Sequence, residues 1–395
     1  MMKCWLLLQF LTRGNSLLTI FGLLFFAAKV TAYPNFISFG YQSCLSCHYN
    51  PFGAGPLTDY GRVVASSAIS ERLFWPSSTT DEEIGNKAGF FFAPDPIDWL
   101  RPSLSYRTLN LTRNLGESGA KRMAVPMDTS ASLVGKFLND DKLTVVVQGG
   151  IAGEQERLLS PSGKAYTTRQ HYVGLRINKE FGLYAGLMDK VFGLRVPDHI
   201  AFSRLKSQNT QYDQTHGVLL HYLGKQVEIG LHPFVGNLSL PPEAQLKGVS
   251  SQLEVSLGEK MRVGASYLRG TMPLTAQQMA ALHARIGIGE GHSLMLELGQ
   301  TQRQQQNFNL RQTSPYLFTQ SHLHLRRGLF ALATIEYQLP DTALKIYSYR
   351  LAPGLQFFPV QRLELRADAY RTTQVFEDGS RKNSWDLAAQ LHVYL

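Results

Sequence analysis

RLELRADAY, residues 362–370, is the stretch that decides the fold. Leucine and alanine alternate in it with arginine, glutamate and aspartate. Because successive side chains of a β-strand point to opposite faces, this pattern predicts a strand with one apolar face and one charged face. The same alternation returns in residues 226–232 and 249–257 and in the final stretch, 386–395.

Similar segments follow one another along the chain, with turn residues between them. They predict sixteen strands, near residues 102–111, 129–138, 142–152, 168–177, 180–189, 215–223, 225–235, 248–257, 260–269, 276–287, 291–302, 314–325, 328–338, 343–356, 360–372 and 383–395. Tight turns such as Gly258-Glu259 alternate with longer connections, at residues 153–167, 190–214, 236–247 and 303–313. This arrangement is typical of an all-β, transmembrane antiparallel β-barrel.

In such a barrel the Leu/Val face contacts lipid, and the Arg/Glu/Gln/His face lines a polar lumen. Closure is required because unpaired backbone groups at a sheet edge cannot be hydrated in hydrocarbon. A water-soluble sandwich or propeller is the alternative. Charged pairs such as Glu364 and Arg366 recur on one face of strand after strand, and no blade repeat of about 40–50 residues is visible, so the membrane barrel is favoured.

The motif Cys44-Leu45-Ser46-Cys47-His48 predicts a covalent haem c site. In that chemistry Cys44 and Cys47 bind the haem through thioethers, and His48 is the proximal ligand of the iron. A loop carbonyl from Pro51 or a neighbour is expected to accept a hydrogen bond from the second ring nitrogen of His48. A disulfide or redox pair and a zinc site are the alternatives.

The sixth iron ligand does not follow from the motif. No Met or His occurs between His48 and Met123, so the ligand is either absent or supplied by the rest of the chain. His199, in the longest loop, is the first candidate if that loop folds inward; weaker candidates are His221, His322, His324 and Met188. The missing ligand suggests that residues 33 to about 90 enter the lumen from the periplasmic side and that the barrel completes the haem pocket.

Residues 1–32 have the layout of a signal peptide. Lys3 and Arg13 precede an apolar run over residues 17–28, and Val30-Thr31-Ala32 is a small-x-small cleavage site. The predicted organisation is a signal peptide over residues 1–32, a haem c segment with its linker over 33–100, and the barrel over 101–395. The formal charge of +9 is spread singly along 395 residues, which argues against a nucleic-acid partner.

The stretch CHxNPxGxGxLxxYGR, residues 47–62, and the FGLRxxDH element of residues 192–199 resemble bacterial outer-membrane β-barrel proteins that carry an N-terminal c-type cytochrome domain. The resemblance implies one covalent haem c and an electron relay at the Gram-negative outer membrane. The partners of the protein are expected to be periplasmic or extracellular cytochromes. The protein itself is expected to be an electron carrier rather than an enzyme. The alternative is a porin, a solute channel with a haem-bearing plug or gate.

Overall fold

The computed structural model describes residues 34–95, 97–116, 119–151, 166–198, 200–205, 210, 213–289, 291–305 and 310–395. The predicted signal peptide, residues 1–32, and the candidate ligand His199 lie outside the described residues. Among the residues described, no helix is both long enough and apolar enough to cross a bilayer.

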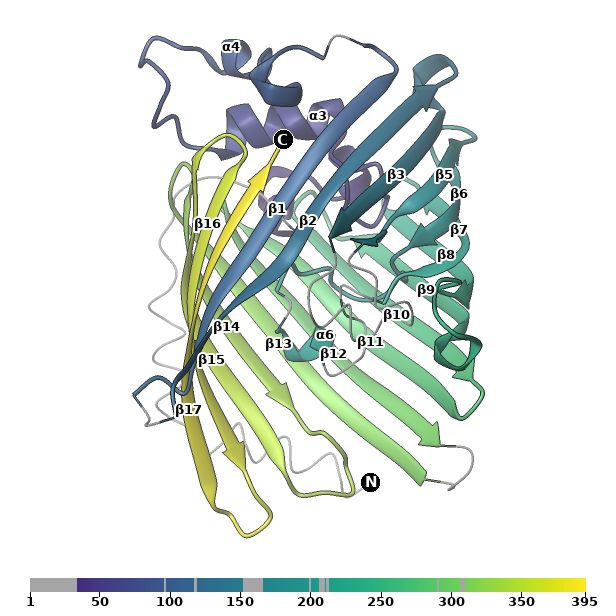
Figure 1. Cartoon of the computed structure of the whole chain (residues 1–395), viewed down its shortest axis with the longest axis vertical. Helices are drawn as coiled ribbons and strands as arrows, with labels where there is room; N and C mark the ends of the chain where they lie inside the picture. The colour runs from purple at the N-terminus through teal and green to yellow at the C-terminus, as the bar shows by residue number, and fades with distance from the viewer. Residues whose placement is uncertain are drawn as a thin grey trace.

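A single sheet of strands forms the wall, and every strand runs antiparallel to its partners (Figure 1). The strands are β1 (Leu100–Arg113), β2 (Lys121–Phe137), β3 (Leu143–Ile151), β4 (Tyr166–Thr167), β5 (His171–Arg176), β6 (Phe181–Met188), β7 (Thr215–Leu223), β8 (Val227–Gly236), β9 (Lys247–Ser256), β10 (Met261–Met272), β11 (Thr275–Ile288), β12 (His292–Gln305), β13 (Leu310–Arg326), β14 (Leu329–Gln338), β15 (Tyr347–Val360), β16 (Leu363–Val375) and β17 (Arg381–Tyr394).

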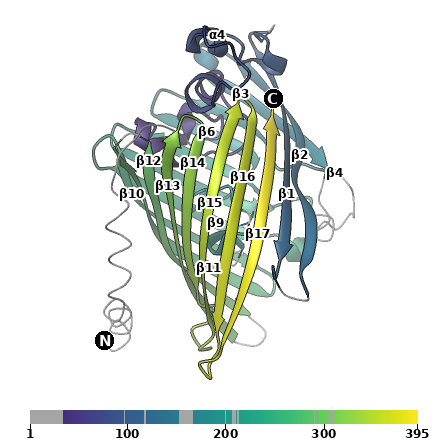
Figure 2. The ribbon, with the colours of Figure 1, turned by 90° about the vertical axis from the view of Figure 1, so that its left-hand side faces the viewer.

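The sheet closes on itself because β1 pairs with both β2 and β17. The two-residue β4 and the strand β5 pair with successive parts of β3, so together they occupy one position in the wall. The described residues therefore form a barrel of sixteen strands, as the alternation predicts. Figure 2 shows the strands β10 to β17 tilted across the wall.

The two faces of the wall confirm the predicted alternation. In β16, Leu365 is 39% exposed on the outside, whereas Glu364 and Arg366 are buried on the inside. β12 and β11 repeat this, with Leu298 and Leu282 exposed on the outside. A water-soluble protein buries its leucines, so this inverted pattern fits a wall that faces hydrocarbon.

The N-terminal segment, residues 34–99, lies at the barrel end that carries the tight turns and the C-terminus (Figure 1). Its helices are short: η1 (Pro34–Phe39), η2 (Cys44–Ser46), α3 (Asp59–Val63), η3 (Val64–Ile69), α4 (Asp81–Gly85) and η4 (Phe90–Phe92). The remaining short helices are η5 (Asn139–Asp141) in a tight turn, α6 (Phe202–Leu205) in the loop after β6, and η6 (Pro242–Ala244) in the loop after β8.

The N-terminal segment packs against two apolar patches on the inner wall. Tyr49 and Phe52 pack on inward-facing residues of β2, β3 and β5 to β7, among them Tyr172 and Leu219. The helix η3 packs on Phe330, Leu332 and Phe358 of β14 and β15. Apolar residues that face inward in an otherwise polar lumen are thus covered by the N-terminal segment.

Buried charges also hold the segment. Arg262 and Arg285 both donate to the carbonyl of Gln42, at 2.8 and 2.9 Å. At the barrel rim, Arg101 forms an ion pair with Asp59 at 2.6 Å. Lumen-facing donors that are removed from water must find acceptors, and backbone carbonyls of the N-terminal segment supply some of them.

The loop between β6 and β7, residues 189–214, is here called the inward loop because its described part folds into the lumen. Phe202 donates its backbone N–H to Glu336 at 2.6 Å, and Tyr370 donates its hydroxyl to Asp198 at 3.0 Å. The backbone N–H of Gly193 donates to the hydroxyl of Ser266 at 3.0 Å. The described part of this loop thus folds inward, which is the condition that the candidate His199 required.

Some boundaries differ from prediction. β2 begins at Lys121 rather than near residue 129, because it extends past Pro126 to pair with the far end of β1. β13 begins at Leu310, which shortens the predicted loop 303–313. Within the predicted haem c segment and linker, residues 33–100, the polar stretch 76–88 contains α4, whose N-terminus is closed by a capping box between Thr80 and Glu83.

We expect Leu298→Arg to lower the unfolding free energy of the bilayer-embedded protein by about 2–4 kcal/mol, because a guanidinium near mid-strand would face hydrocarbon. Leu344→Arg is the matched control, since Leu344 is 51% exposed against 58% for Leu298 but lies in the connection between β14 and β15. Denaturant titration in lipid vesicles measures the difference. Equal stabilities for the two variants would contradict a lipid-facing β12.

Candidate functional site

A cavity of about 410 Å³ lies in the lumen between the N-terminal segment and the inward loop. Its volume is within the range of small-molecule sites, about 300–1,000 Å³. Cys44, Cys47 and His48 line it from the N-terminal segment, and residues 192–198 line it from the inward loop. The structure thus brings the predicted site residues Cys44, Cys47 and His48 to one cavity, which barrel strands enclose.

The motif itself forms one tight turn. Ser43 caps the turn η2 by accepting a hydrogen bond from the backbone N–H of Leu45 at 3.3 Å. The backbone N–H groups of Cys47 and His48 both donate to the carbonyl of Cys44, at 3.1 and 2.9 Å. Both cysteines are free thiols.

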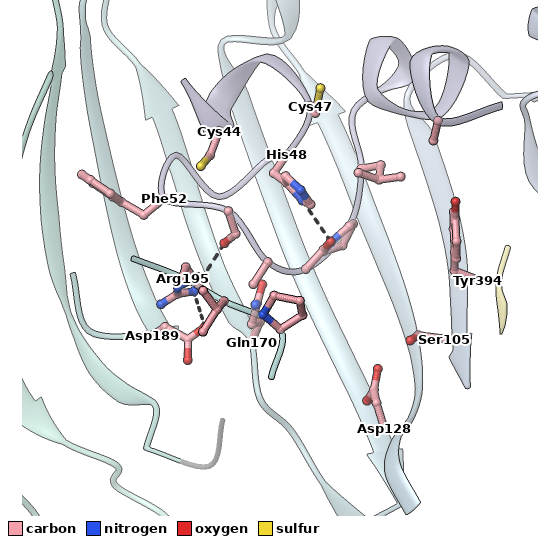
Figure 3. Close-up of a pocket in the computed structure, with 18 of the residues that line it drawn as sticks. Cys44, Cys47, His48, Phe52, Ser105, Asp128, Gln170, Asp189, Arg195 and Tyr394 are labelled. Carbon is pink, nitrogen blue, oxygen red and sulfur yellow. Dashed lines mark hydrogen bonds and ion pairs between the residues drawn. The ribbon is translucent and has the colours of Figure 1, made fainter. Parts of the chain in front are cut away.

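His48 is oriented by the loop that follows it. Its Nδ1 lies 3.4 Å from the carbonyl of Gly55, so that Nδ1–H donates and Nε2 keeps its lone pair (Figure 3). This is the predicted second-nitrogen hydrogen bond, with Gly55 as the acceptor rather than Pro51. Desolvation lowers the pKa of His48 to about 4, so the imidazole is neutral at neutral pH, the form that binds metals.

The loop depends on backbone conformations that side chains disfavour. Gly53 and Gly55 have φ of +83° and +72°, in the left-handed region, with Ala54 at +65° between them. The side chain of Asn50 accepts from the backbone N–H of Phe52 at 3.0 Å and starts the turn. The spacing NPxGxG in the sequence therefore encodes the loop that carries the Gly55 carbonyl back to His48.

Gly61 fixes the distance between α3 and the motif. A Cβ at this position would lie 2.3 Å from the carbonyl oxygen of Cys47. Thr58 caps α3 with its side chain, and its backbone N–H donates to that same carbonyl at 2.9 Å. The TDYGR part of the sequence thus packs a helix directly on the two-cysteine turn.

Burial acts against ionisation of both thiols. Burial raises the pKa of Cys47 to about 11 and also raises that of Cys44. Reactive cysteines have lowered pKa values because the thiolate is the nucleophile. Figure 3 shows the two sulfur atoms pointing in different directions, so attachment of both to one macrocycle would require at least one side chain to rotate.

The donor set and its surroundings fit a haem c. Two cysteines with free thiols and a hydrogen-bonded histidine line one cavity, whose lining also includes Phe52 and Leu57. Three arginines that line the cavity are engaged with protein groups. Arg62 pairs with Asp95, Arg195 with Asp189, and Arg204 donates to the carbonyl of Leu194.

The weaker candidates for a sixth ligand are not among the residues that line the cavity. His221 hydrogen-bonds Glu228 at 2.9 Å, and Met188 packs in the apolar cluster around Tyr49. Among the described residues, the histidines that line the cavity are His48 and His392. His392 was missed as a site residue; its signal was its place on the polar face of the last strand, beside its partner Glu364 at 3.0 Å.

Within the described ranges, no three side chains of His, Cys, Asp or Glu come together as a set that could hold a bare metal ion.

No protein-family model matches the chain, and no curated protein sequence matches it. Solved structures do match. OmpT, an outer-membrane protein of Vibrio cholerae, is 9% identical over 75% of this chain and 97% of that chain, with a TM-score of 0.58. The outer membrane channel DcaP of Acinetobacter baumannii is 12% identical over 75% and 97%, with a TM-score of 0.56. An anion-selective porin from Comamonas acidovorans is 9% identical over 75% and 99%, with a TM-score of 0.56.

The chain has the fold of an outer-membrane porin. At these identities the likeness concerns the fold alone. The predicted barrel is confirmed, whereas the c-type cytochrome part of the predicted resemblance stays a prediction.

We expect Gly61→Ala to raise the rate at which a maleimide labels Cys47 by at least about fivefold, because the added methyl must push α3 away from the motif. The measurement uses protein refolded without haem. Gly149→Ala is the control, since no atom lies within 4 Å of a Cβ at that position. Equal labelling rates in the two variants would show that α3 does not protect the motif.

Proposed function

We propose that this chain is a porin-like channel of the Gram-negative outer membrane whose lumen is gated by a haem-bearing plug, the N-terminal segment. The cavity that the CxxCH turn shares with the inward loop and the wall carries this proposal. The likeness to porins and channels supports the barrel part, and the exposed leucines of the outer face support residence in a bilayer.

In this proposal Cys44 and Cys47 would hold the haem through thioethers, and His48 would supply Nε2 as an iron ligand. A bound haem supplies a centre that exchanges single electrons. The chain's own residues do the positioning: the Gly55 carbonyl fixes the tautomer of His48, and Gly61 keeps α3 against Cys47. His199, between Asp198 and Ile200 of the inward loop, is the proposed sixth ligand.

The gating part rests on how the lumen is filled. Gln42 is held by Arg262 and Arg285 and donates to the carbonyl of Gly258, so the plug contacts the inner wall beside the tight turn between β9 and β10. At the rim, Arg327 donates to the carbonyl of Ser70 at 2.8 Å and pairs with Asp81 at 2.9 Å. Solute can cross only where the plug or the inward loop leaves a path, so release of the plug would open the channel.

The electron relay predicted from the motif stays a second proposal. A single haem cannot carry electrons across a hydrocarbon layer of about 30 Å, so periplasmic or extracellular cytochromes would have to complete the path. The CxxCH turn favours this function, but the porin fold favours the channel more strongly.

We expect covalent haem staining of the full chain when a cytochrome-maturing host produces it. The double variant Cys44→Ser/Cys47→Ser should lose the stain, because no thioether can form. Cys4→Ser, in the predicted leader, is the matched control and should keep it. A colourless, unstained wild-type protein would exclude the haem-bearing plug.

We expect the double variant Arg101→Met/Arg327→Met to conduct more than the wild type in planar bilayers, because it loses the rim anchors of the plug to Asp59 and Asp81. The double variant Arg122→Met/Arg381→Met removes the same charge from exposed positions and should conduct as the wild type does. A wild-type pore that is already fully open, with conductance equal to that of the rim variant, would contradict gating by the plug.

A further inference from the structure

Arg107 of β1 is a buried cation that faces the cavity. Its side chain lines the cavity, and the residue is only 8% exposed. Within the described part of the chain, its Nε and Nη2 atoms are buried and have no hydrogen-bond partner. Other arginines of the same cavity are engaged: Arg62 pairs with Asp95 and donates to the carbonyl of Pro102 at 2.8 Å.

The carboxylates of the wall around Arg107 bond to other donors. Strand pairing places Asp128 of β2 opposite Arg107, and Asp128 accepts from Arg169 at 3.1 Å. On the other side, Glu364 of β16 attracts Arg107, but its oxygens accept from His392 at 3.0 Å and from Gln356 at 2.9 Å. The wall therefore surrounds Arg107 with acceptors that already hold hydrogen bonds.

A buried guanidinium without a hydrogen-bond partner is costly, since it loses its hydration and gains no replacement. A planar carboxylate is the group that satisfies it best, because its two oxygens match the guanidinium fork. The two atoms of Arg107 without a hydrogen-bond partner, Nε and Nη2, are adjacent donors on one edge of the guanidinium.

We propose that Arg107 is a binding residue of the cavity and holds a carboxylate of the molecule that occupies it. That carboxylate can come from a propionate of the covalent haem or from a carboxylate solute that enters the lumen. The propionate source rests on the proposed haem-bearing plug, whereas the solute source does not.

The test compares Arg107→Gln with Arg113→Gln, an exposed arginine of the same strand. In haem-loaded protein the readout is the midpoint reduction potential. In the Cys44→Ser/Cys47→Ser background, which cannot attach haem, the readout is succinate binding by calorimetry in detergent. Arg107→Lys keeps the positive charge but lacks the paired guanidinium donors. Its reduction potential and its succinate binding are both measured, in case the glutamine variant does not fold.

A propionate source predicts a potential that shifts in Arg107→Gln and not in Arg113→Gln, with no succinate binding in the haem-free protein. A solute source predicts succinate binding that Arg107→Gln weakens at least about tenfold, with a smaller loss for Arg107→Lys. If the potential is unchanged and no Arg107-dependent succinate binding exists, the proposal is overturned. Failure of haem attachment in every protein would instead remove the haem-bearing plug and leave the succinate arm to decide the role of Arg107.

Discussion

The need to satisfy buried charge inside a closed barrel governs this structure. Closure of the sheet turns the apolar face outward and gathers carboxylates and guanidinium groups around a narrow lumen. Many of them are removed from water: Glu228 and Arg262 are almost fully buried and pair with each other. Partners for such groups come from across the wall and from two other elements, the N-terminal segment and the inward loop, both of which place backbone and side-chain groups against them.

The cavity follows from this constraint. The N-terminal segment covers the inner wall at the end with the tight turns, and the inward loop crosses the lumen next to it. The space left between them is lined by both and by strands, so a ligand there would touch three separately encoded parts of the chain. The CxxCH turn is held at the edge of that space by short-range contacts, from Ser43 to Gly61, which the sequence encodes within twenty residues.

The sequence predicts what is local and periodic. Alternation places all sixteen barrel strands and matches β7 to the residue, because one lipid-facing and one lumen-facing side impose a strict period of two. The spacing of prolines and glycines after His48 predicts the loop whose carbonyl orients it. The beginning of β2 is missed because Pro126 interrupts the pattern, and α4 is missed because its helical signal is a capping box in a polar stretch.

What the sequence does not predict is which lumen-facing residues meet the site. Arg107 and His392 look like dozens of other polar strand residues until strand pairing and closure set them opposite each other on β1 and β17. Their importance arises from register and from the path of the N-terminal segment, and neither has a local signature.

Position 52 offers the most direct measurement of the central claim that the N-terminal segment occupies the lumen. The ring of Phe52 lies 5.5 Å from that of His221, on the inner face of β7. A benzophenone amino acid placed at position 52 and irradiated in intact cells should cross-link within the same chain to β7 or β8, as mass spectrometry of the peptides would show. Cross-links from this position to other proteins, or none to the barrel wall, would contradict the account.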